Sequence, residues 1–418
     1  MKELFFTNLV GSPFEICILA LLASTMENDF KMVAVTMFGL EEVLAKELKD
    51  LGARDVLVGI RNVSFKGDKG FMYKANISLR TAIRILKPIR RFRVRNEDDL
   101  YNSLQKINWE RFLDVDGTFA IGSVVNSSFF TTNSHYISLK SKDAIADYYR
   151  HKYSKRPNID LKYPALKIHI HIKDDFCTVS LDSSGESLHK RGYRSSTNIA
   201  PINEVLAAGL VLLSGYTGEQ NFIDPMCGSG TILIEATMIA CRIPANINRK
   251  HFAFENWPDF DEDLFFVIQD ALLKKISSSH FKIMGFDKAP SAVQKAKENI
   301  ENANLSEFVG VHHINFFNSR KEVFGATTIL FNPPYGERLE LADLEGFYKN
   351  IGDTLKNGYP DSTVWFITSD LQALKHVGLR TSKRIPMKNG DLDCRFVRYD
   401  MYEGSRKAKK TEWGTTEV

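Results

Sequence analysis

Residues 222–231 read FIDPMCGSGT: an apolar strand ends at an acidic residue, a glycine turn follows, and a helix begins. Glycine lets the backbone approach a ligand closely, and the first turn of a helix offers unpaired N–H groups. No Gly-Lys-Ser/Thr of a Walker loop is present, and Leu233 stands where a dinucleotide fingerprint has its third glycine. An acidic side chain before the glycines suits a positively charged sulfonium better than a pyrophosphate. A plain strand–turn–helix corner without a ligand is the alternative.

Strands and helices alternate around this corner, which predicts an α/β, doubly wound, mostly parallel sheet. A helix that starts at Pro201 and runs through Leu213 precedes it, with proline in the first turn, and residues 384–403 predict a closing antiparallel pair around Asn389-Gly390. The stretch Ile243–His280 must be an insertion. The predicted strands are Asn221–Asp224, Lys282–Asp287, Val309–Asn315, Thr327–Asn332 and Thr363–Ser369, and the helices are Thr231–Cys241, Pro290–Asn304 and Leu344–Leu355.

The region before this sheet predicts smaller α+β units. Its first unit comprises strands Val33–Thr36, Asp55–Ile60 and Val63–Lys66, a helix from Gly39 to Gly52 and a helix over Gly70–Leu86. Its second comprises helices Tyr101–Phe112 and Ser138–Tyr149 and strands Thr118–Val125, Leu166–Ile172 and Phe176–Asp182. Residues 185–198 predict a basic linker. His169 and His171 are expected to face solvent or a partner, and we expect no metal site because no third ligand stands near them.

The composition and the two chain ends limit the classes of protein to which the sequence can belong. The 418 residues predict two or three domains, and the five cysteines are scattered without a C-x-x-C pair, which favours a reducing, cytoplasmic compartment. The apolar run Ile16–Ala23 is too short to span a bilayer. We expect residues 1–31 to be a leader or an upstream start, and residues 405–418 to be a disordered tail.

Two basic clusters predict contacts with nucleic-acid phosphates, although a solvated surface is the alternative for each. The net charge is only +4, so local clustering carries this prediction. The candidate RNA-binding residues are Lys87, Arg90, Arg91 and Arg93 in the first cluster and Lys190, Arg191 and Arg194 in the second.

The ends of the second and third strands complete the predicted cofactor site. Asp287 ends the second strand, where an acidic side chain can accept both hydroxyl groups of a ribose. Asn315 and Phe316 end the third strand and could meet the edge and face of an adenine, with core packing the alternative for Phe316. The candidate cofactor-binding residues are Asp224, Pro225, Gly228, Ser229, Gly230, Thr231, Asp287, Asn315 and Phe316.

The sequence Asn332-Pro333-Pro334-Tyr335 ends the fourth strand and predicts the chemistry. An amino group on a base is a poor nucleophile, because the ring delocalises its lone pair. The side-chain carbonyl of Asn332 and the backbone carbonyl of Pro333 can accept its two hydrogens, with prolines holding both acceptors in place, and Tyr335 offers a face for an extruded base. A surface Pro-Pro turn is the alternative. Methylation of a pyrimidine carbon is disfavoured, because no cysteine lies near Asn332 in the sequence.

These motifs, together with Lys190–Arg194, Ala200–Glu204 and Glu337-Arg338, resemble class I S-adenosylmethionine-dependent RNA methyltransferases that carry a THUMP domain. The nearest resemblance is to the bacterial large-subunit rRNA guanine-N2 group, often labelled N6-adenine-specific DNA methylases. It covers Val33 to Tyr402, although Asn315 stands where related enzymes often carry aspartate. The resemblance implies a ferredoxin-like segment (32–95), a THUMP domain (96–185) and a Rossmann-like methyltransferase domain (186–404).

The resemblance implies S-adenosylmethionine as cofactor and structured RNA as partner, ribosomal or transfer RNA. We expect guanine N2 of 23S rRNA as the target, and a single modification, because no second methyltransferase domain follows. Three alternatives remain: a tRNA guanine-N2 methyltransferase, an N6-adenine DNA methylase, and a non-catalytic RNA-binding factor.

Overall fold

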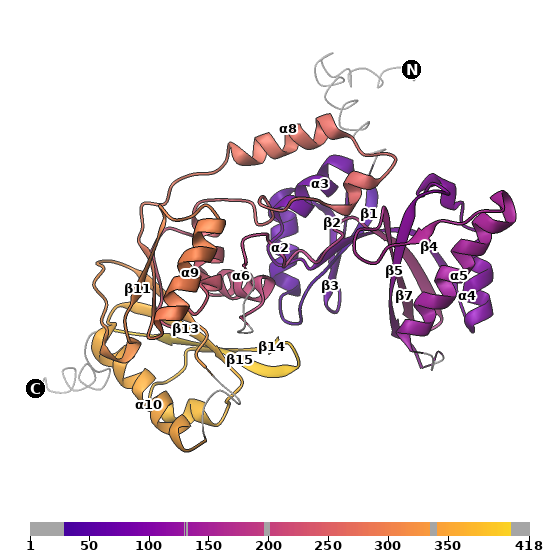
Figure 1. Ribbon diagram of the computed structural model, residues 1–418. Coiled ribbons are helices and arrows are strands. Elements are labelled where there is room, and N and C mark those ends of the chain that lie inside the picture. The colour runs from indigo at the N-terminus through magenta and orange to yellow at the C-terminus, as the bar shows by residue number, and fades with distance from the viewer. Residues whose placement is uncertain (1–28, 129, 131–132, 196–200, 335–340, 403–418) are drawn as a thin grey trace, which may run out of the picture.

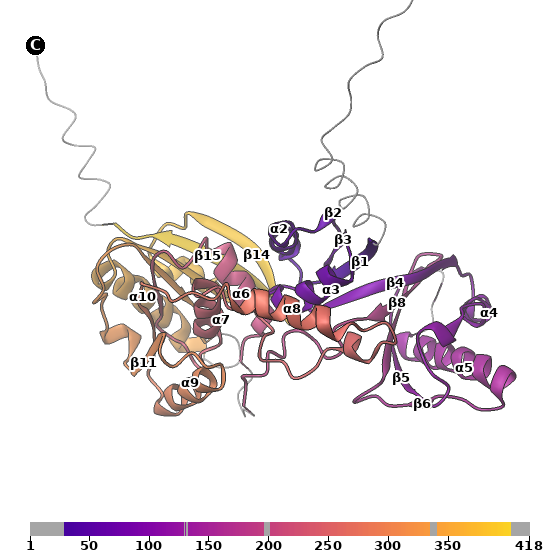
Figure 2. The same ribbon diagram turned by 90° about the horizontal axis from the view of Figure 1, so that it is seen from above.

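The computed structural model describes residues 29–402, apart from 129, 131–132, 196–200 and 335–340. An N-terminal half and a C-terminal half, each built on its own sheet, lie side by side (Figures 1 and 2). The predicted leader and tail fall almost wholly outside the described residues. The predicted leader is two residues too long, however, because Phe30 and Lys31 already belong to the first strand and pair with β3.

The first unit has the order β–α–β–β–α–β of a ferredoxin-like fold, and its strands lie in the order β2-β3-β1-β4. The predicted helix over Gly70–Leu86 is wrong in its second half: the helix ends at Ser78, and Ile85 and Leu86 belong to a strand. These two residues pair with β1, so strand pairing and burial override the local helical pattern. The elements are β1 (Phe30–Val35), α2 (Glu41–Leu51), β2 (Arg54–Val58), β3 (Asn62–Gly67), α3 (Lys69–Ser78) and β4 (Arg84–Arg93).

The second unit extends the same sheet, because β4 pairs with β8. The result is one eight-stranded sheet in the order β2-β3-β1-β4-β8-β7-β5-β6. The predicted strand Leu166–Ile172 is confirmed, with every second residue buried, and the turn to β8 has Asp174 at φ 52°. The elements are α4 (Glu97–Gln105), β5 (Thr118–Asn126), α5 (Ser134–Tyr153), β6 (Asn158–Ile159), β7 (Leu166–Lys173) and β8 (Phe176–Asp182).

The C-terminal half confirms the predicted doubly wound sheet, in the order β11-β10-β9-β12-β13-β15-β14. Its first five strands are parallel, and β15 and β14 close it in antiparallel fashion. The first helix begins at Glu204 rather than Pro201, because the side chain of Asn203 caps it by accepting from Val205 N. The elements are α6 (Glu204–Leu213), β9 (Asn221–Asp224), α7 (Thr231–Ala240), β10 (Ile283–Asp287), α9 (Pro290–Asn302), β11 (Val309–His313), β12 (Thr327–Phe331), α10 (Leu341–Gly358), β13 (Ser362–Thr368), β14 (Lys383–Asn389) and β15 (Leu392–Asp400).

The insertion between α7 and β10 leaves its own sheet and packs on the other half (Figures 1 and 2). It contains a 3₁₀ turn (Ala253–Asn256) and α8 (Glu262–Leu273), which lies against α3. The ring of Phe254 stacks on Tyr73 with centroids 4.5 Å apart, and the Tyr73 hydroxyl accepts from Asp261 N at 3.0 Å. The insertion therefore completes the core of the ferredoxin-like unit.

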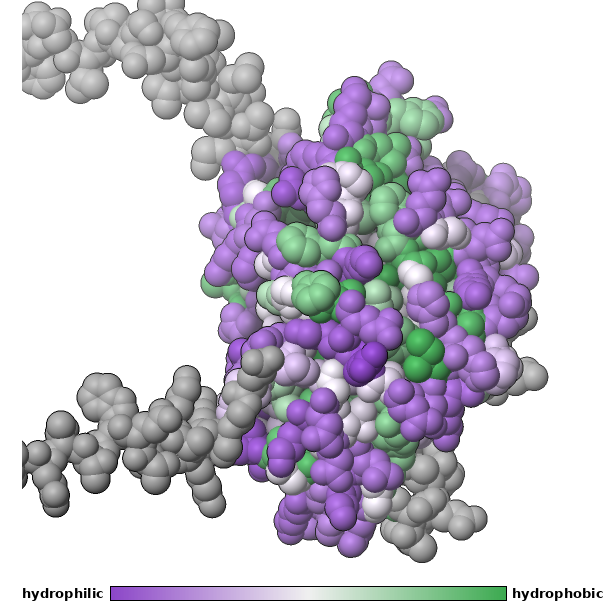
Figure 3. Space-filling model, turned by 90° about the vertical axis from the view of Figure 1, so that its left-hand side faces the viewer, coloured by the Kyte–Doolittle hydropathy of each residue, from purple (hydrophilic) through white to green (hydrophobic). Residues whose placement is uncertain are grey.

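The outer surface of the C-terminal half is hydrophilic over much of its area, with apolar side chains gathered toward the middle of the view (Figure 3). Within the described ranges, no helix is both long and apolar enough to cross a membrane.

Candidate cofactor and base-binding site

Three polar residues meet at one edge of the C-terminal sheet, because they end three adjacent parallel strands. Asp224 ends β9, Asp287 ends β10 on one side of it, and Asn332 follows β12 on the other side. Gly285 stands opposite Asp224, and Ile329 stands opposite Ile223, so the three strand ends are in register. In open α/β sheets, ligands bind at this carboxyl edge.

The glycine corner after β9 is open toward this edge. Gly228 and Gly230 have φ of 53° and 79°, in the left-handed region that favours glycine. A Cβ on Gly228 would meet no atom within 4 Å, whereas one on Gly230 would lie 3.2 Å from Ala296 Cβ. No side chain caps the start of α7 at Thr231, so the corner offers a ligand both space and helix N–H groups.

The two carboxylates of the edge have different surroundings. Asp287 Oδ2 accepts from Gly228 N and Oδ1 accepts from Ala289 N, both at 2.9 Å, which fixes this carboxylate at the head of the corner. Asp224 is 1% exposed, and burial raises the pKa of its carboxyl well above the usual range, with the nearby Asp287 charge adding to the effect. A positively charged ligand beside Asp224 would favour the ionised form of its carboxyl and lower this pKa. The corner and its carboxylates thus fit the sulfonium and ribose of S-adenosylmethionine.

The third strand end differs from the prediction. Asn315 is exposed, and its Oδ1 accepts from Phe317 N at 3.1 Å. The ring of Phe316 is 2% exposed and packs 5.7 Å from the rings of Phe331 and Tyr359. The prediction that Phe316 stacks on an adenine is therefore wrong, because the turn directs this ring into the core and leaves it no open face.

The side chain of Asn332 has a feature that suits it to bind the amino group of a target base. Its Oδ1 is buried and has no hydrogen-bond partner among the described residues, and Pro333 beside it is also buried. A buried acceptor without a partner costs free energy, so it marks a place where a donor of a ligand can be received. Pro334 is partly exposed, and Tyr335 lies outside the described residues.

Cys227 in the glycine corner is not suited to act as a nucleophile. It is 7% exposed, and burial raises the pKa of its thiol well above the usual range. Its Sγ lies against β10, 3.2 Å from the position of a Cβ on Gly285. The four cysteines within the described residues are all buried thiols.

Three of the seven predicted RNA contacts are engaged with other groups of the protein. Arg191 is 1% exposed and holds Glu235, and the guanidinium of Arg194 binds Thr231 and Ile202. The ammonium of Lys87 lies 4.2 Å from the ring centroid of Phe30, facing the insertion. Only the Arg191 contact is wrong, because the chain folds over this side chain; those of Lys87 and Arg194 are 23% and 24% exposed, and their role in RNA binding stays a prediction.

The other four predicted RNA contacts remain at the surface. Arg90 and Arg91 are exposed on β4, and Arg91 lies over the ring of Phe176. Arg93 pairs with Asp175, and Lys190 pairs with Glu186, each at 2.8 Å. The side chains of Arg93 and Lys190 stay largely exposed. Their role in RNA binding stays a prediction. His169 and His171, expected at the surface, are half-buried on the face of β7 opposite its isoleucines.

Sequence reasoning missed Asn299, which contacts the glycine corner. Its Nδ2 donates to Ser229 O at 2.9 Å, from the buried face of α9. A polar residue on an apolar helical face, between Ala296 and Ile300, was a signal that could have indicated it. Within the part of the chain that the structure describes, no group of three or more His, Cys, Asp or Glu is placed to hold a metal ion.

Three family models match the chain. One is described as an RlmL ferredoxin-like domain (residues 31–86), one as a THUMP domain (94–182) and one as an RMKL-like methyltransferase domain (191–398). A provisionally named RNA methyltransferase of Synechocystis is 35% identical over 366 residues, which cover 87% of this chain and 95% of the relative. The ribosomal RNA large subunit methyltransferase K/L of Photobacterium profundum is 34% identical over 386 residues, or 91% of this chain. The chain spans about half of that relative's length (54%).

Solved structures agree in fold with these relatives. The crystal structure of SMU.472, a provisionally assigned methyltransferase in complex with SAH, superposes with a TM-score of 0.81 at 29% sequence identity. The superposition covers 90% of this chain and 100% of the other. SAH is S-adenosylhomocysteine, the product that S-adenosylmethionine leaves after methyl transfer.

Proposed function

Because the chain belongs to the family of THUMP-containing, RMKL-like methyltransferases, we propose that it methylates a ring-attached amino group of a base in structured RNA, with guanine N2 of large-subunit ribosomal RNA as the favoured target. The chain is an S-adenosylmethionine-dependent methyltransferase. The relatives named as RNA and ribosomal RNA methyltransferases, together with the THUMP match, support RNA as the substrate and the cytoplasm as the place of action.

One observation carries the proposed chemistry: Oδ1 of Asn332 is buried, has no partner within the described part of the chain, and lies at the same sheet edge as Asp224 and Asp287. An acceptor held in place before the substrate arrives needs no reorganisation during the reaction. An amino group with two hydrogens can satisfy Asn332 Oδ1 with one and the backbone carbonyl of Pro333 with the other. This pair of contacts favours an exocyclic amine over a ring carbon or a hydroxyl group.

The cofactor supplies a methyl group on a positively charged sulfur. Asp287 would hold the ribose hydroxyls, since its carboxylate is fixed by Gly228 N and Ala289 N. Asp224 and the N–H groups at the start of α7 would hold the methionine part. Asn332 and Pro333 would orient the amine so that its lone pair faces the methyl carbon, which makes the reaction chiefly a matter of alignment. The methyl carbon would exchange its bond to sulfur for a bond to the nitrogen, the sulfur would leave as a neutral thioether, and the nitrogen would lose one of its protons.

Asn332→Ala tests this role. We expect kcat for methyl transfer to large-subunit ribosomal RNA to fall about 10²- to 10³-fold, the usual loss when one prearranged hydrogen-bonding group is removed. S-adenosylhomocysteine binding should be kept. Asn302→Ala, a change of the same residue type at an exposed position of α9, is the matched control. Unchanged turnover in Asn332→Ala would remove this residue from its proposed role.

The target base needs its own experiment. Nucleoside mass spectrometry of ribosomal and transfer RNA, from cells with and without the gene, should show loss of N2-methylguanosine from large-subunit RNA. Loss from tRNA would instead indicate a tRNA guanine-N2 methyltransferase, and loss of N6-methyladenine from DNA would indicate a DNA methylase. No change in any nucleoside, with RNA binding retained, would favour the non-catalytic factor.

A further inference from the structure

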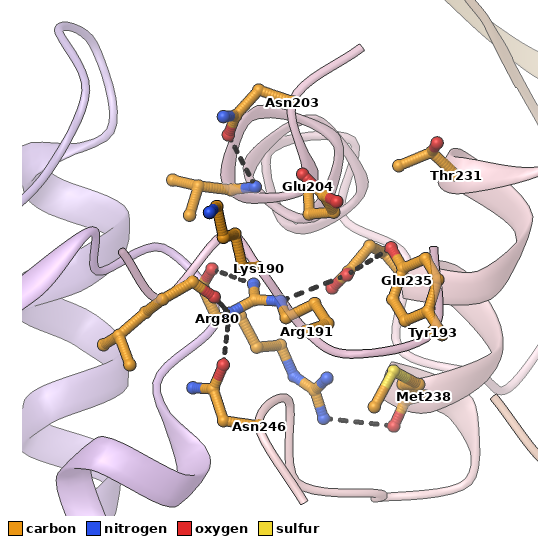
Figure 4. A network of polar contacts seen from close by, with 12 residues as sticks. Arg80, Lys190, Arg191, Tyr193, Asn203, Glu204, Thr231, Glu235, Met238 and Asn246 are labelled. Carbon is orange, nitrogen blue, oxygen red and sulfur yellow. Dashed lines mark hydrogen bonds and ion pairs between the residues drawn. The ribbon is translucent and has the colours of Figure 1, made fainter. Parts of the chain in front are cut away.

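The segment that joins the two halves, Leu188–Ser195, runs through a buried polar network (Figure 4). Arg191 lies at its centre and donates to Leu188 O at 2.7 Å, Asn246 Oδ1 at 2.9 Å and Arg80 O at 2.5 Å. Its Nε lies 3.3 Å from Glu235 Oε1, which also accepts from the Tyr193 hydroxyl at 3.1 Å. This segment, called the linker below, is therefore a fixed part of both halves.

The linker reaches the cofactor corner through Arg194. One terminal nitrogen of its guanidinium, Nη2, donates to Ile202 O at 3.0 Å and to the Thr231 hydroxyl at 3.1 Å. Its Nε lies 3.2 Å from Glu204 Oε1, a carboxylate whose side chain is 3% exposed. Thr231 is itself 2% exposed and is the first residue of α7. Arg194 thus ties the start of this helix to the linker and to α6.

Asn299 makes a second tie on the other side of the corner. Its Nδ2 donates to Ser229 O at 2.9 Å, while its Oδ1 accepts from Ser195 N at 3.2 Å and lies 3.3 Å from Ser195 Oγ. Asn299 is 1% exposed, so solvent cannot replace these partners. One amide side chain therefore bridges the linker and the peptide group between Ser229 and Gly230.

We propose that Arg194 and Asn299 are positioning residues of the cofactor corner, and that the linker thereby forms part of the cofactor site. Fixing Ser229 O sets the plane of the following peptide, whose Gly230 N–H donates to Cys227 O at 2.8 Å and closes the turn. Fixing the Thr231 hydroxyl sets the first turn of α7. Glycines at positive φ have many accessible conformations, so these external ties hold the corner ready for the ligand. The proposal rests on the assignment of residues 228–231 to the cofactor and not on the identity of the target base.

Binding of S-adenosylhomocysteine to the full chain, measured by isothermal titration calorimetry, tests the proposal without any RNA. Asn299→Ala should raise Kd about ten-fold, the effect of one lost hydrogen bond to a buried group. Asn299→Asp should bind more weakly still, because a carboxylate would repel Ser229 O. Asn302→Ala, exposed on the same helix, should bind as the unaltered chain does.

Thr231 supplies a second pair of variants that keeps the test informative if Asn299→Ala fails to fold. Thr231→Ser keeps the hydroxyl that Arg194 binds and should bind more tightly than Thr231→Val, which removes the hydroxyl at equal size. In steady-state assays, Thr231→Val should raise KM for S-adenosylmethionine and leave kcat at saturating cofactor within about two-fold, since the corner is positioned once occupied.

Normal binding by folded Asn299→Ala and Thr231→Val would overturn the positioning roles. An unaltered chain that binds no S-adenosylhomocysteine would overturn the assignment of the corner itself, and the positioning roles with it. Equal loss in Thr231→Ser and Thr231→Val would also contradict the proposal, because the hydroxyl would then not matter.

Discussion

Arg191→Met is expected to destabilise the protein by about 3–5 kcal/mol, because it leaves the carboxylate of Glu235 buried without its cation. Both side chains are almost fully enclosed, at 1% and 0% exposed. Glu235→Gln removes the charge but keeps an acceptor for the Tyr193 hydroxyl, and Arg191 retains three neutral oxygens as partners. We expect a cost of only about 1–2 kcal/mol for this change.

The double variant of Arg191→Met and Glu235→Gln removes both members of this buried ion pair and leaves the Arg80 guanidinium with its carbonyl partners, Met238 O and Ile243 O. It should therefore be more stable than the sum of the single costs predicts, by about 2 kcal/mol. Urea unfolding, followed by circular dichroism, measures the four free energies of unfolding. Calorimetry is the comparison, because a chain of two halves need not unfold in one step. Arg156→Met, at an exposed arginine, is the control. Additive costs, or a cost below about 1 kcal/mol for Arg191→Met, would refute the argument.

Three further predictions follow from the structure. Arg90→Glu combined with Arg91→Glu should weaken RNA binding and reduce the slope of log Kd against log salt concentration in filter-binding assays, whereas Lys274→Glu, directly after α8, should leave the slope unchanged. Burial, followed by the Arg84 charge, lowers the pKa of His169 to about 4 from 6.5; the unfolded chain therefore takes up a proton first as the pH falls. The free energy of unfolding should accordingly fall as the pH drops from 6.5 to 4, by at most about 2 kcal/mol between pH 7 and pH 5. In urea unfolding, the His169→Gln variant should show a smaller decrease, because it lacks this protonation. Gly285→Ala should lower the free energy of unfolding by about 1–3 kcal/mol, because its Cβ would lie 2.2 Å from Leu233 Cδ1; Gly346→Ala, with open space around its Cβ, should not.

The C-terminal sheet could be predicted from the sequence because each of its elements carries its own local signal. The first strand was predicted with the bounds that the structure has, Asn221–Asp224, since a short apolar run ends at an acidic residue and glycines. β4 was missed for the opposite reason: its apolar residues follow a helix without a glycine or proline to separate them. Only its partners, β1 and β8, distinguish it as a strand.

Site residues were predictable where a backbone requirement reveals them, and not where tertiary contacts decide. The positive φ of Gly228 and Gly230 demands glycine, so the corner is visible in the sequence. Arg191 and Arg194 look like surface residues, because a basic residue in a polar stretch is usually solvated. Their hydrogen-bond acceptors belong to residues far away in the chain, such as Arg80, Thr231 and Glu235. No local sequence pattern predicts these contacts.

The insertion shows why the two halves should not be considered separately. Its position in the sequence assigns it to the methyltransferase sheet, yet Phe252, Phe254 and Trp257 are buried in the core of the ferredoxin-like unit. Hydrophobic burial does not depend on sequence order, so a segment packs wherever it removes the most apolar surface from water. The linker makes a second connection, through Arg191, between the carbonyl of Arg80 in the N-terminal half and Glu235 in α7. Two separate connections resist rotation where one would act as a hinge, so a THUMP-bound RNA would be held at a fixed position relative to the carboxyl edge where Asn332 lies.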